Sequence, residues 1–290
     1  MKINQEMKRK IVQVAAFGYS NTYIGNFVSG QIYKGRWKQF CNPGMNCYSC
    51  PAARLACPIG AMQAVSGSMN FKLSFYVIGF VLALGVVFGR AICGFFCPFG
   101  LIQELIYKIP FPKKKLWKWL TYVKYVLLAV FVVIMPVTMV NELGMSSPAF
   151  CEYICPAGTL EGGIPLLSTH PELRATLGAL FSVKACILII TLIGCLSVCR
   201  FFCKVMCPLG AIYGLLNKVS IYHMECNKKT CVSCGKCHNI MSDGCRSSEE
   251  SQFCRVHPMW KMCGIMPERI TGFEVRIWKK RDSFINIFRK

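Results

Sequence analysis

The chain is poor in acidic side chains and in histidine. It contains 13 aspartates and glutamates against 34 lysines and arginines, and four histidines. These histidines form no recognisable catalytic set, and no flavin-binding motif is present, so nothing in the sequence points to a substrate pocket; they are His170, His223, His238 and His257. A net charge of +21 would suit nucleic acid. However, the basic residues flank apolar segments, as they do at the cytoplasmic ends of membrane helices, so nucleic acid is not an expected partner.

Apolar residues are abundant instead. They make up 54% of the 290 residues, too many for an ordinary soluble domain. Three apolar segments are long enough to cross a membrane, namely residues 71–89, 116–140 and 175–199. A weaker candidate, residues 11–30, spans the membrane, re-enters it or lies at its interface. We predict an α-helical integral membrane protein of about four transmembrane helices, internally duplicated, with a small C-terminal ferredoxin-like α+β module.

The charges beside these segments predict an orientation. Residues 90–118 are strongly basic and residues 142–174 are acidic, which places the first on the cytoplasmic side and the second outside. Residues 31–70 would then also lie outside, although their basic side chains conflict with that rule. Lys184, within the third segment, should either reach the interface or pair inside the membrane. The expected location is the inner (cytoplasmic) membrane, crossed several times, with the C-terminal module in the cytoplasm.

The cysteines fall in repeated motifs that indicate a duplication. Four copies of C-P-x-G begin at Cys57, Cys97, Cys155 and Cys207. Each half of the chain reads as an external C-P-x-G, an apolar segment and a cytoplasmic C-x3-C-P-x-G. We therefore predict a membrane domain over residues 1–220, built from pseudo-repeats at about 9–110 and 111–220, and a ferredoxin-like module over residues 221–290.

Thiolates at this spacing are the ligands that iron, iron–sulfur clusters and zinc require. If the halves pack about a pseudo-two-fold axis, four cysteines should converge near the cytoplasmic face: Cys93, Cys97, Cys203 and Cys207. On the external face, Cys151 and Cys155 should join Cys57 and one or two of Cys41, Cys47 and Cys50, of which Cys47 and Cys50 are preferred. A disulfide is the alternative on that face. The proline should turn the chain away from the site, and the glycine should let backbone approach it.

The tail carries a more specific signal. Cys231, Cys234 and Cys237 have the spacing of the first three ligands of a bacterial ferredoxin motif, which predicts a 4Fe–4S cluster. A zinc knuckle is the alternative. The fourth ligand is expected at position 241, where Met241 stands.

A shift of reading frame would explain the missing cysteine. Methionine and tryptophan each have one codon, so part of the coding sequence can be recovered. When the coding sequence is read one nucleotide later, the codons of Met259 to Met266 encode a second ferredoxin motif, provided that the codon of Val256 is GTG. The same shift converts the codons of Met241 and Ser242 into a codon for the missing cysteine. We therefore expect residues from about 241 onward to be translated out of frame. In the frame as it stands, Cys226, Cys245, Cys254 and Cys263 are the candidate fourth ligands, and Cys263 is preferred.

These motifs resemble those of the NapH-like and NosR-like membrane ferredoxins over roughly residues 9 to 240. The stretch from Asn46 to Gly60 is similar to a subgroup of 4Fe–4S binding proteins of anaerobic bacteria. The resemblance implies cluster ligation by Cys231, Cys234 and Cys237 and a redox role for the cytoplasmic C-x3-C-P loops.

The expected function is therefore electron transfer between a membrane or external redox partner and the cytoplasmic side. We expect the protein to be an electron-transfer subunit more than a stand-alone enzyme. The partner would be a quinone or a protein, with a flavin-bearing protein suggested by the family alone. The alternatives are a membrane thiol–disulfide oxidoreductase and a soft-metal transporter or sensor.

Overall fold

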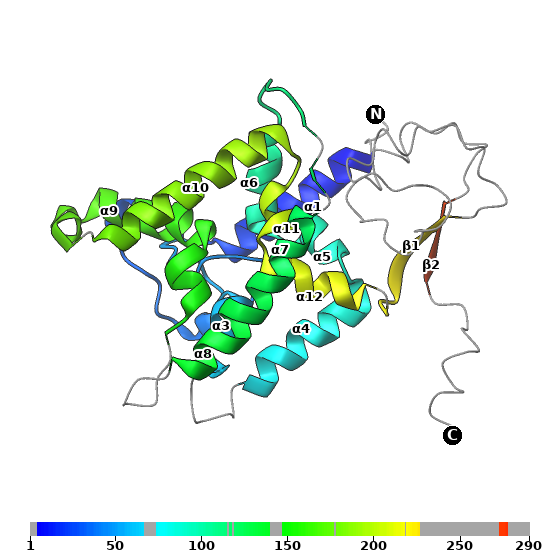
Figure 1. Ribbon diagram of the computed structural model, residues 1–290, viewed down its shortest axis with the longest axis horizontal. Coiled ribbons are helices and arrows are strands. Elements are labelled where there is room, and N and C mark those ends of the chain that lie inside the picture. The colour runs from blue at the N-terminus through cyan, green and yellow to red at the C-terminus, as the bar shows by residue number, and fades with distance from the viewer. Residues whose placement is uncertain are drawn as a thin grey trace.

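The structure, a computed structural model, describes residues 5–66, 74–114, 116–117, 119–139, 147–176, 178–217, 219–226 and 273–277. These parts are predominantly helical (Figure 1). The N-terminal part contains α1 (Gln5–Ser20), α2 (Asn26–Ser29), η1 (Arg36–Gln39) and α3 (Pro58–Ser66). The central part contains α4 (Ser74–Phe88), α5 (Ala91–Phe95), α6 (Pro98–Tyr107), α7 (Leu120–Leu127), η3 (Leu128–Ile134) and α8 (Met135–Thr138).

The rest of the described chain consists of short helices and one long helix, followed by a strand. It contains η4 (Phe150–Ile154), η5 (Gly158–Gly163), α9 (Ile164–Thr169), η6 (Pro171–Thr176), α10 (Ala179–Ser197), α11 (Phe201–Val205) and α12 (Pro208–Leu216). Its strand β1 (Tyr222–Cys226) pairs antiparallel with β2 (Phe273–Ile277), at one end of the molecule (Figure 1).

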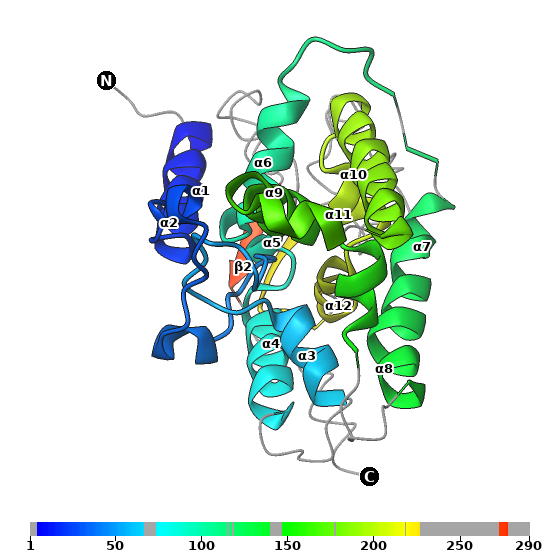
Figure 2. The same cartoon turned by 90° about the vertical axis from the view of Figure 1, so that its left-hand side faces the viewer.

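Two helical columns are long and apolar enough to cross a membrane. The segments α7, η3 and α8 form one of them, Leu120–Thr138, and α10 forms the other, Ala179–Ser197 (Figure 2). The third predicted segment forms α4, an apolar helix that is shorter than these two. The helices lie where the apolar segments predict them. A total of four spans stays a prediction.

The weaker N-terminal candidate is not one continuous helix. Helix α1 ends at Ser20, a turn follows, and α2 occupies only Asn26–Ser29 before Gly30 adopts a left-handed conformation. Ser20 and Asn21 bond back to carbonyls one turn earlier, as polar residues at a helix end commonly do. The alternative of a single membrane span over residues 11–30 is therefore wrong.

The C-P-x-G motifs form helix starts, which corrects the expectation that their prolines turn the chain away. Pro58, Pro98 and Pro208 are the first residues of α3, α6 and α12, and Pro156 begins the helical turn that leads into η5. Proline suits this position because its fixed φ is helical and its missing N–H would have no partner there. Each motif cysteine therefore lies at a helix N-terminus, where the helix dipole favours negative charge.

Candidate iron–sulfur sites

The structure brings together the thiols of Cys93, Cys97, Cys203 and Cys207, here called set I. Cys93 and Cys203 lie in the short helices α5 and α11, whereas Cys97 and Cys207 directly precede α6 and α12. Burial, together with the neighbouring Cys203, raises the pKa of Cys93 to about 11. Burial also raises the pKa of Cys207, with further contributions from the other three thiols. The predicted convergence of the two loops is therefore present.

A second group, set II, consists of Cys47, Cys57, Cys151 and Cys155. Burial, together with Cys57 and Cys47, raises the pKa of Cys151 to about 12. Burial raises the pKa of Cys155 as well, with additions from Cys151 and Cys57. A Cβ added at Gly158 would lie 3.8 Å from the Cys155 sulfur and 3.9 Å from the Cys47 sulfur. The loop of residues 41–56 thus supplies one thiol, the C-P-x-G cysteines Cys57 and Cys155 supply two, and Cys151 of the C-x3-C pair supplies the fourth.

Cys41 and Cys50 lie beside set II. Cys41 neighbours Cys57, and Cys50 packs with Ala52 and Ala53 and faces Glu161 and Lys38. Thus Cys47, and not Cys50, is grouped with Cys57, Cys151 and Cys155 as the fourth thiol of set II. The described cysteines are all free thiols, so the disulfide alternative finds no pair among them. Cys231, Cys234, Cys237 and Cys263 lie outside the described residues.

The four thiols of each set match in number the four thiolates that hold a four-iron cluster. Within the described part of the chain, no three His, Cys, Asp or Glu side chains lie close enough to hold one metal ion. A four-iron cluster presents a separate iron to each thiolate, so its ligands are neighbours that do not meet at one point. The buried thiols would lose their protons on binding iron.

Backbone N–H groups at the helix starts point at the sulfurs. The N–H of Gly210 donates to the sulfur of Cys207 at 3.3 Å, and that of Gly158 donates to the sulfur of Cys155 at 3.4 Å. A Cβ at Gly210 would lie 3.1 Å from the carbonyl oxygen of Cys203, so the expected close approach at this glycine is confirmed. Such donors stabilise negative charge on a thiolate or on a cluster bound to it.

Two glutamines hold the loops of each set together in the same way. The amide of Gln103 donates to the Cys203 sulfur at 3.2 Å, and its oxygen accepts from the Phe202 N–H at 3.1 Å. The amide of Gln63 donates to the Cys151 sulfur at 3.5 Å, and its oxygen accepts from the Phe150 N–H at 2.8 Å. Both glutamines are buried, and each stands six residues after a motif cysteine.

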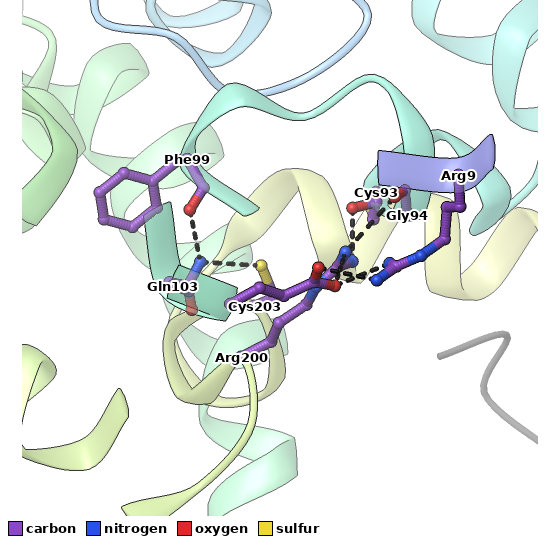
Figure 3. Close-up of polar contacts among 8 residues, drawn as sticks. Arg9, Cys93, Gly94, Phe99, Gln103, Arg200 and Cys203 are labelled. Atoms are coloured by element: carbon purple, nitrogen blue, oxygen red, sulfur yellow. Dashed lines mark hydrogen bonds and ion pairs between the residues drawn. The ribbon is translucent and has the colours of Figure 1, made fainter. Parts of the chain in front are cut away.

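A buried ion network adjoins set I (Figure 3). Arg200 is fully buried in a left-handed backbone conformation, and its guanidinium donates to the carbonyl oxygens of Cys93 and Gly94 and to Glu104. Glu104 also accepts two hydrogen bonds from Arg9, at 2.7 and 2.8 Å. The structure therefore places a fixed positive charge within reach of the set I thiols, where it would stabilise an anionic cluster.

Motif spacing could have revealed several contacts that the sequence reasoning missed. The sixth residue after the four motif cysteines is Gln63, Gln103, Glu161 and Tyr213 in turn, and all four make buried contacts at the sites. Arginine also precedes both C-x3-C pairs of set I by three residues, as Arg90 and Arg200. Lys184 donates to the carbonyl oxygen of Cys151 at 3.3 Å, so it has a partner inside the protein.

The model of a family described as "4Fe-4S binding domain" matches residues 73–118, 124–168 and 180–222. These segments include all of set I together with Cys151 and Cys155. An uncharacterized protein of Methanocaldococcus jannaschii is 31% identical over 60% of this chain and 66% of its own length.

Two relatives have descriptive names. The putative electron transport protein YccM of Escherichia coli is 26% identical over 59% of this chain and 45% of its own length. The methylamine utilization ferredoxin-type protein MauN of Methylorubrum extorquens is 26% identical over 56% of this chain and 51% of its own length. The chain is a ferredoxin-type 4Fe–4S protein. It spans about half to two thirds of the lengths of these relatives. No solved structure matches this ferredoxin-type protein significantly.

Replacing Gln103 with leucine is expected to lower the midpoint potential of one cluster. The substitution removes the amide donor to the Cys203 sulfur, and hydrogen bonds to sulfur favour the more negative, reduced state. It also leaves the buried N–H of Phe202 without an acceptor, which costs about 1–3 kcal/mol of stability.

An EPR-monitored redox titration of the anaerobic protein measures the shift. The matched variant Gln63→Leu should lower the potential of the other cluster instead. If both variants titrate like the wild type while keeping their iron, the glutamines do not act on the clusters.

Proposed function

We propose that this ferredoxin-type protein is a membrane electron carrier of the NapH/NosR type that passes electrons through two clusters, one in each set. The observation that carries the proposal is the presence, in one helical domain, of two groups of four thiols, two of them buried and two partly buried in each group. Bound clusters supply one-electron chemistry, and the chain provides thiolate ligands, hydrogen bonds to sulfur and exclusion of water.

The exposed surface of the helices supports a membrane location. Each of the two long apolar columns is only 17% buried, whereas a core helix of a soluble protein is mostly buried. Apolar side chains stay exposed along α10, at Val183, Ile189, Ile190 and Ile193. In contrast, Arg200 and Lys204 are buried. This inverted distribution suits lipid as the surrounding solvent.

The start of the first column has the composition of a membrane interface. Trp117 and Trp119 are 75% and 77% exposed, and they lie beside the basic residues 113–115. Tryptophan gathers at the headgroup level of bilayers, and lysine excess marks the cytoplasmic side. We therefore place residues 90–118 and set I at the cytoplasmic face.

The burial of the thiols favours electron transfer over the alternative functions. A thiol–disulfide oxidoreductase needs an accessible thiol of low pKa, whereas burial raises the pKa of Cys151 to about 12. A soft-metal carrier needs ligands that converge on one ion, and the described residues offer no such group. The partners are proposed to be a quinone or a redox protein at one face and a cytoplasmic redox protein at the other.

Anaerobic purification in detergent tests this function. Iron and acid-labile sulfide in equal amounts are expected, with EPR signals of reduced clusters after treatment with dithionite. Removal of the iron with a chelator should abolish the signals and lower the thermal stability, because the bound cluster stabilises the folded state. Protein without iron or sulfide, or with zinc alone, would contradict the proposal.

The tail extends the proposal to a cytoplasmic cluster held by Cys231, Cys234 and Cys237. Sequencing the source gene from the codon of Cys237 to the stop is expected to reveal one extra nucleotide before the codon of Met241. The restored frame would supply the fourth ligand and a complete second ferredoxin motif. An intact frame across independent reads would contradict the frameshift and leave Cys263 as the fourth ligand.

A further inference from the structure

One short segment of chain lies between the two sets of cysteines. Residues 41–47, Cys-Asn-Pro-Gly-Met-Asn-Cys, end at Cys47, a member of set II. Asn42, Met45 and Asn46 are each at most 2% exposed, although they belong to a loop. Loops normally lie at the surface because their backbone groups need water or other partners, so the burial of this loop calls for a structural reason.

The middle of the segment packs against set I. A Cβ added to Gly44 would lie 2.5 Å from the Cα of Cys97 and 2.8 Å from the carbonyl oxygen of Phe96. Glycine is therefore required here because its backbone touches that of a set I cysteine. The carbonyl oxygen of Met45 lies 4.0 Å from the sulfur of Cys97.

The end of the segment belongs to set II. A Cβ at Gly162 would lie 3.4 Å from the sulfur of Cys47, and one at Gly158 would lie 3.9 Å from it. Both glycines belong to the π-helical segment that follows Cys155. The N–H of Cys47 donates to the carboxylate of Glu161 at 2.9 Å. The chain thus passes from one set to the other within the few residues between Gly44 and Cys47.

Adjacent residues of the segment neighbour thiols of different sets. Burial raises the pKa of Cys97, and a backbone hydrogen bond from Met45 opposes that rise. Burial likewise raises the pKa of Cys57 in set II, and a backbone hydrogen bond from Asn46 opposes it. Met45 and Asn46 are consecutive, so one peptide bond separates a contact to set I from a contact to set II.

Two motif side chains hold the segment at its ends. Tyr213, from α12, is fully buried and donates its hydroxyl to the carbonyl oxygen of Pro43 at 2.9 Å. Glu161 binds the N–H of Cys47 at the other end. Both stand six residues after a motif cysteine, the position that Gln63 and Gln103 occupy in the other two copies.

We propose that the backbone from Gly44 to Cys47 is the path by which one electron passes directly from the cluster of one set to that of the other. The donor cluster loses one electron and the acceptor cluster gains it, with no bond formed or broken and no additional carrier. Electron tunnelling weakens steeply with distance and is helped by bonded and hydrogen-bonded paths, and this segment provides both. The inference rests on the proposed function, since it requires a cluster in each set.

EPR of the dithionite-reduced, anaerobically purified protein tests the path. Clusters bound in both sets would be joined by the short segment from Gly44 to Cys47 and should couple magnetically when reduced, so the wild-type spectrum should show broadening or splitting. Cys207→Ser and Cys57→Ser should each keep one cluster and give an uncoupled spectrum. A wild-type spectrum equal to the sum of these two would overturn the inference, as would a single cluster in the wild type. Neither result would count against iron–sulfur function, whereas absence of iron would.

A second variant tests the role of the segment itself. Tyr213→Phe keeps the aromatic ring and removes the bond to Pro43, so both clusters should remain by iron and sulfide content while the coupling becomes weaker. Tyr122→Phe, at an exposed tyrosine of α7, is the control and should keep the wild-type coupling. Unchanged coupling in Tyr213→Phe, with both clusters present, would overturn the assignment of this segment as the path.

Discussion

Replacing Cys207 with serine is expected to remove one cluster and to leave the other intact. The Cys207 sulfur lies in set I at the start of α12, where the N–H of Gly210 donates to it. A serine hydroxyl keeps the size of the side chain and is a poor ligand for iron. We expect the membrane domain to lose about half of its iron and sulfide, because the proposed function assigns one cluster of the same kind to each set.

Metal analysis and EPR of the reduced protein measure this loss. Cys186→Ser is the matched control, because Cys186 is an exposed free thiol on α10 outside both sets. Cys57→Ser should give the reciprocal loss of the cluster in set II. A full complement of iron in Cys207→Ser, or an equal loss in Cys186→Ser, would contradict the assignment of set I.

Replacing Glu104 with glutamine is expected to destabilise the fold strongly. The Glu104 carboxylate lies between Arg200, whose side chain is 1% exposed, and Arg9, whose side chain is 12% exposed. The substitution keeps the shape of the side chain and removes its charge, so the Arg200 guanidinium is left buried without its carboxylate. Removing one partner of a buried ion pair typically costs about 3–5 kcal/mol.

Thermal unfolding in detergent, followed by circular dichroism, measures this effect. Glu172→Gln, at an exposed glutamate, is the control and should unfold like the wild type. An anionic cluster in set I would partly balance the charge of Arg200, so the difference should increase after the iron is removed. If Glu104→Gln and Glu172→Gln unfold at the same temperature, the network does not stabilise the fold.

Local sequence features placed the three long apolar helices, whereas the role of the thiols as ligands stays a prediction. An apolar run long enough to span a bilayer forms a helix whatever its neighbours are, so the three long apolar segments could be placed from composition. The C-x3-C-P spacing positions two thiols on a short helix and on the start of the next one, which is a local property. The turn that the prolines were expected to make was wrong, because the start of a helix is also a common place for proline.

The fourth ligand of set II could not be chosen from the sequence. Counting back four residues from Cys57, as in the C-x3-C pairs, leads to Ala53. Cys41, Cys47 and Cys50 were all available, and the packing of the loop against η5 selected Cys47. The choice depends on contacts between residues that are more than a hundred positions apart, which no local spacing encodes.

The sequence by itself determined the chemistry of this protein: which thiols occur in ligand spacing, which segments are apolar, and that a 4Fe–4S cluster is the cofactor they suit. Tertiary structure alone decided which loops meet, that Arg200 and Glu104 lie beside one set, and that Met45 and Asn46 connect the two. The physical reason is that ligand spacing and hydrophobicity are properties of short segments. Burial, charge pairing and the distance between two sites depend on how distant segments pack.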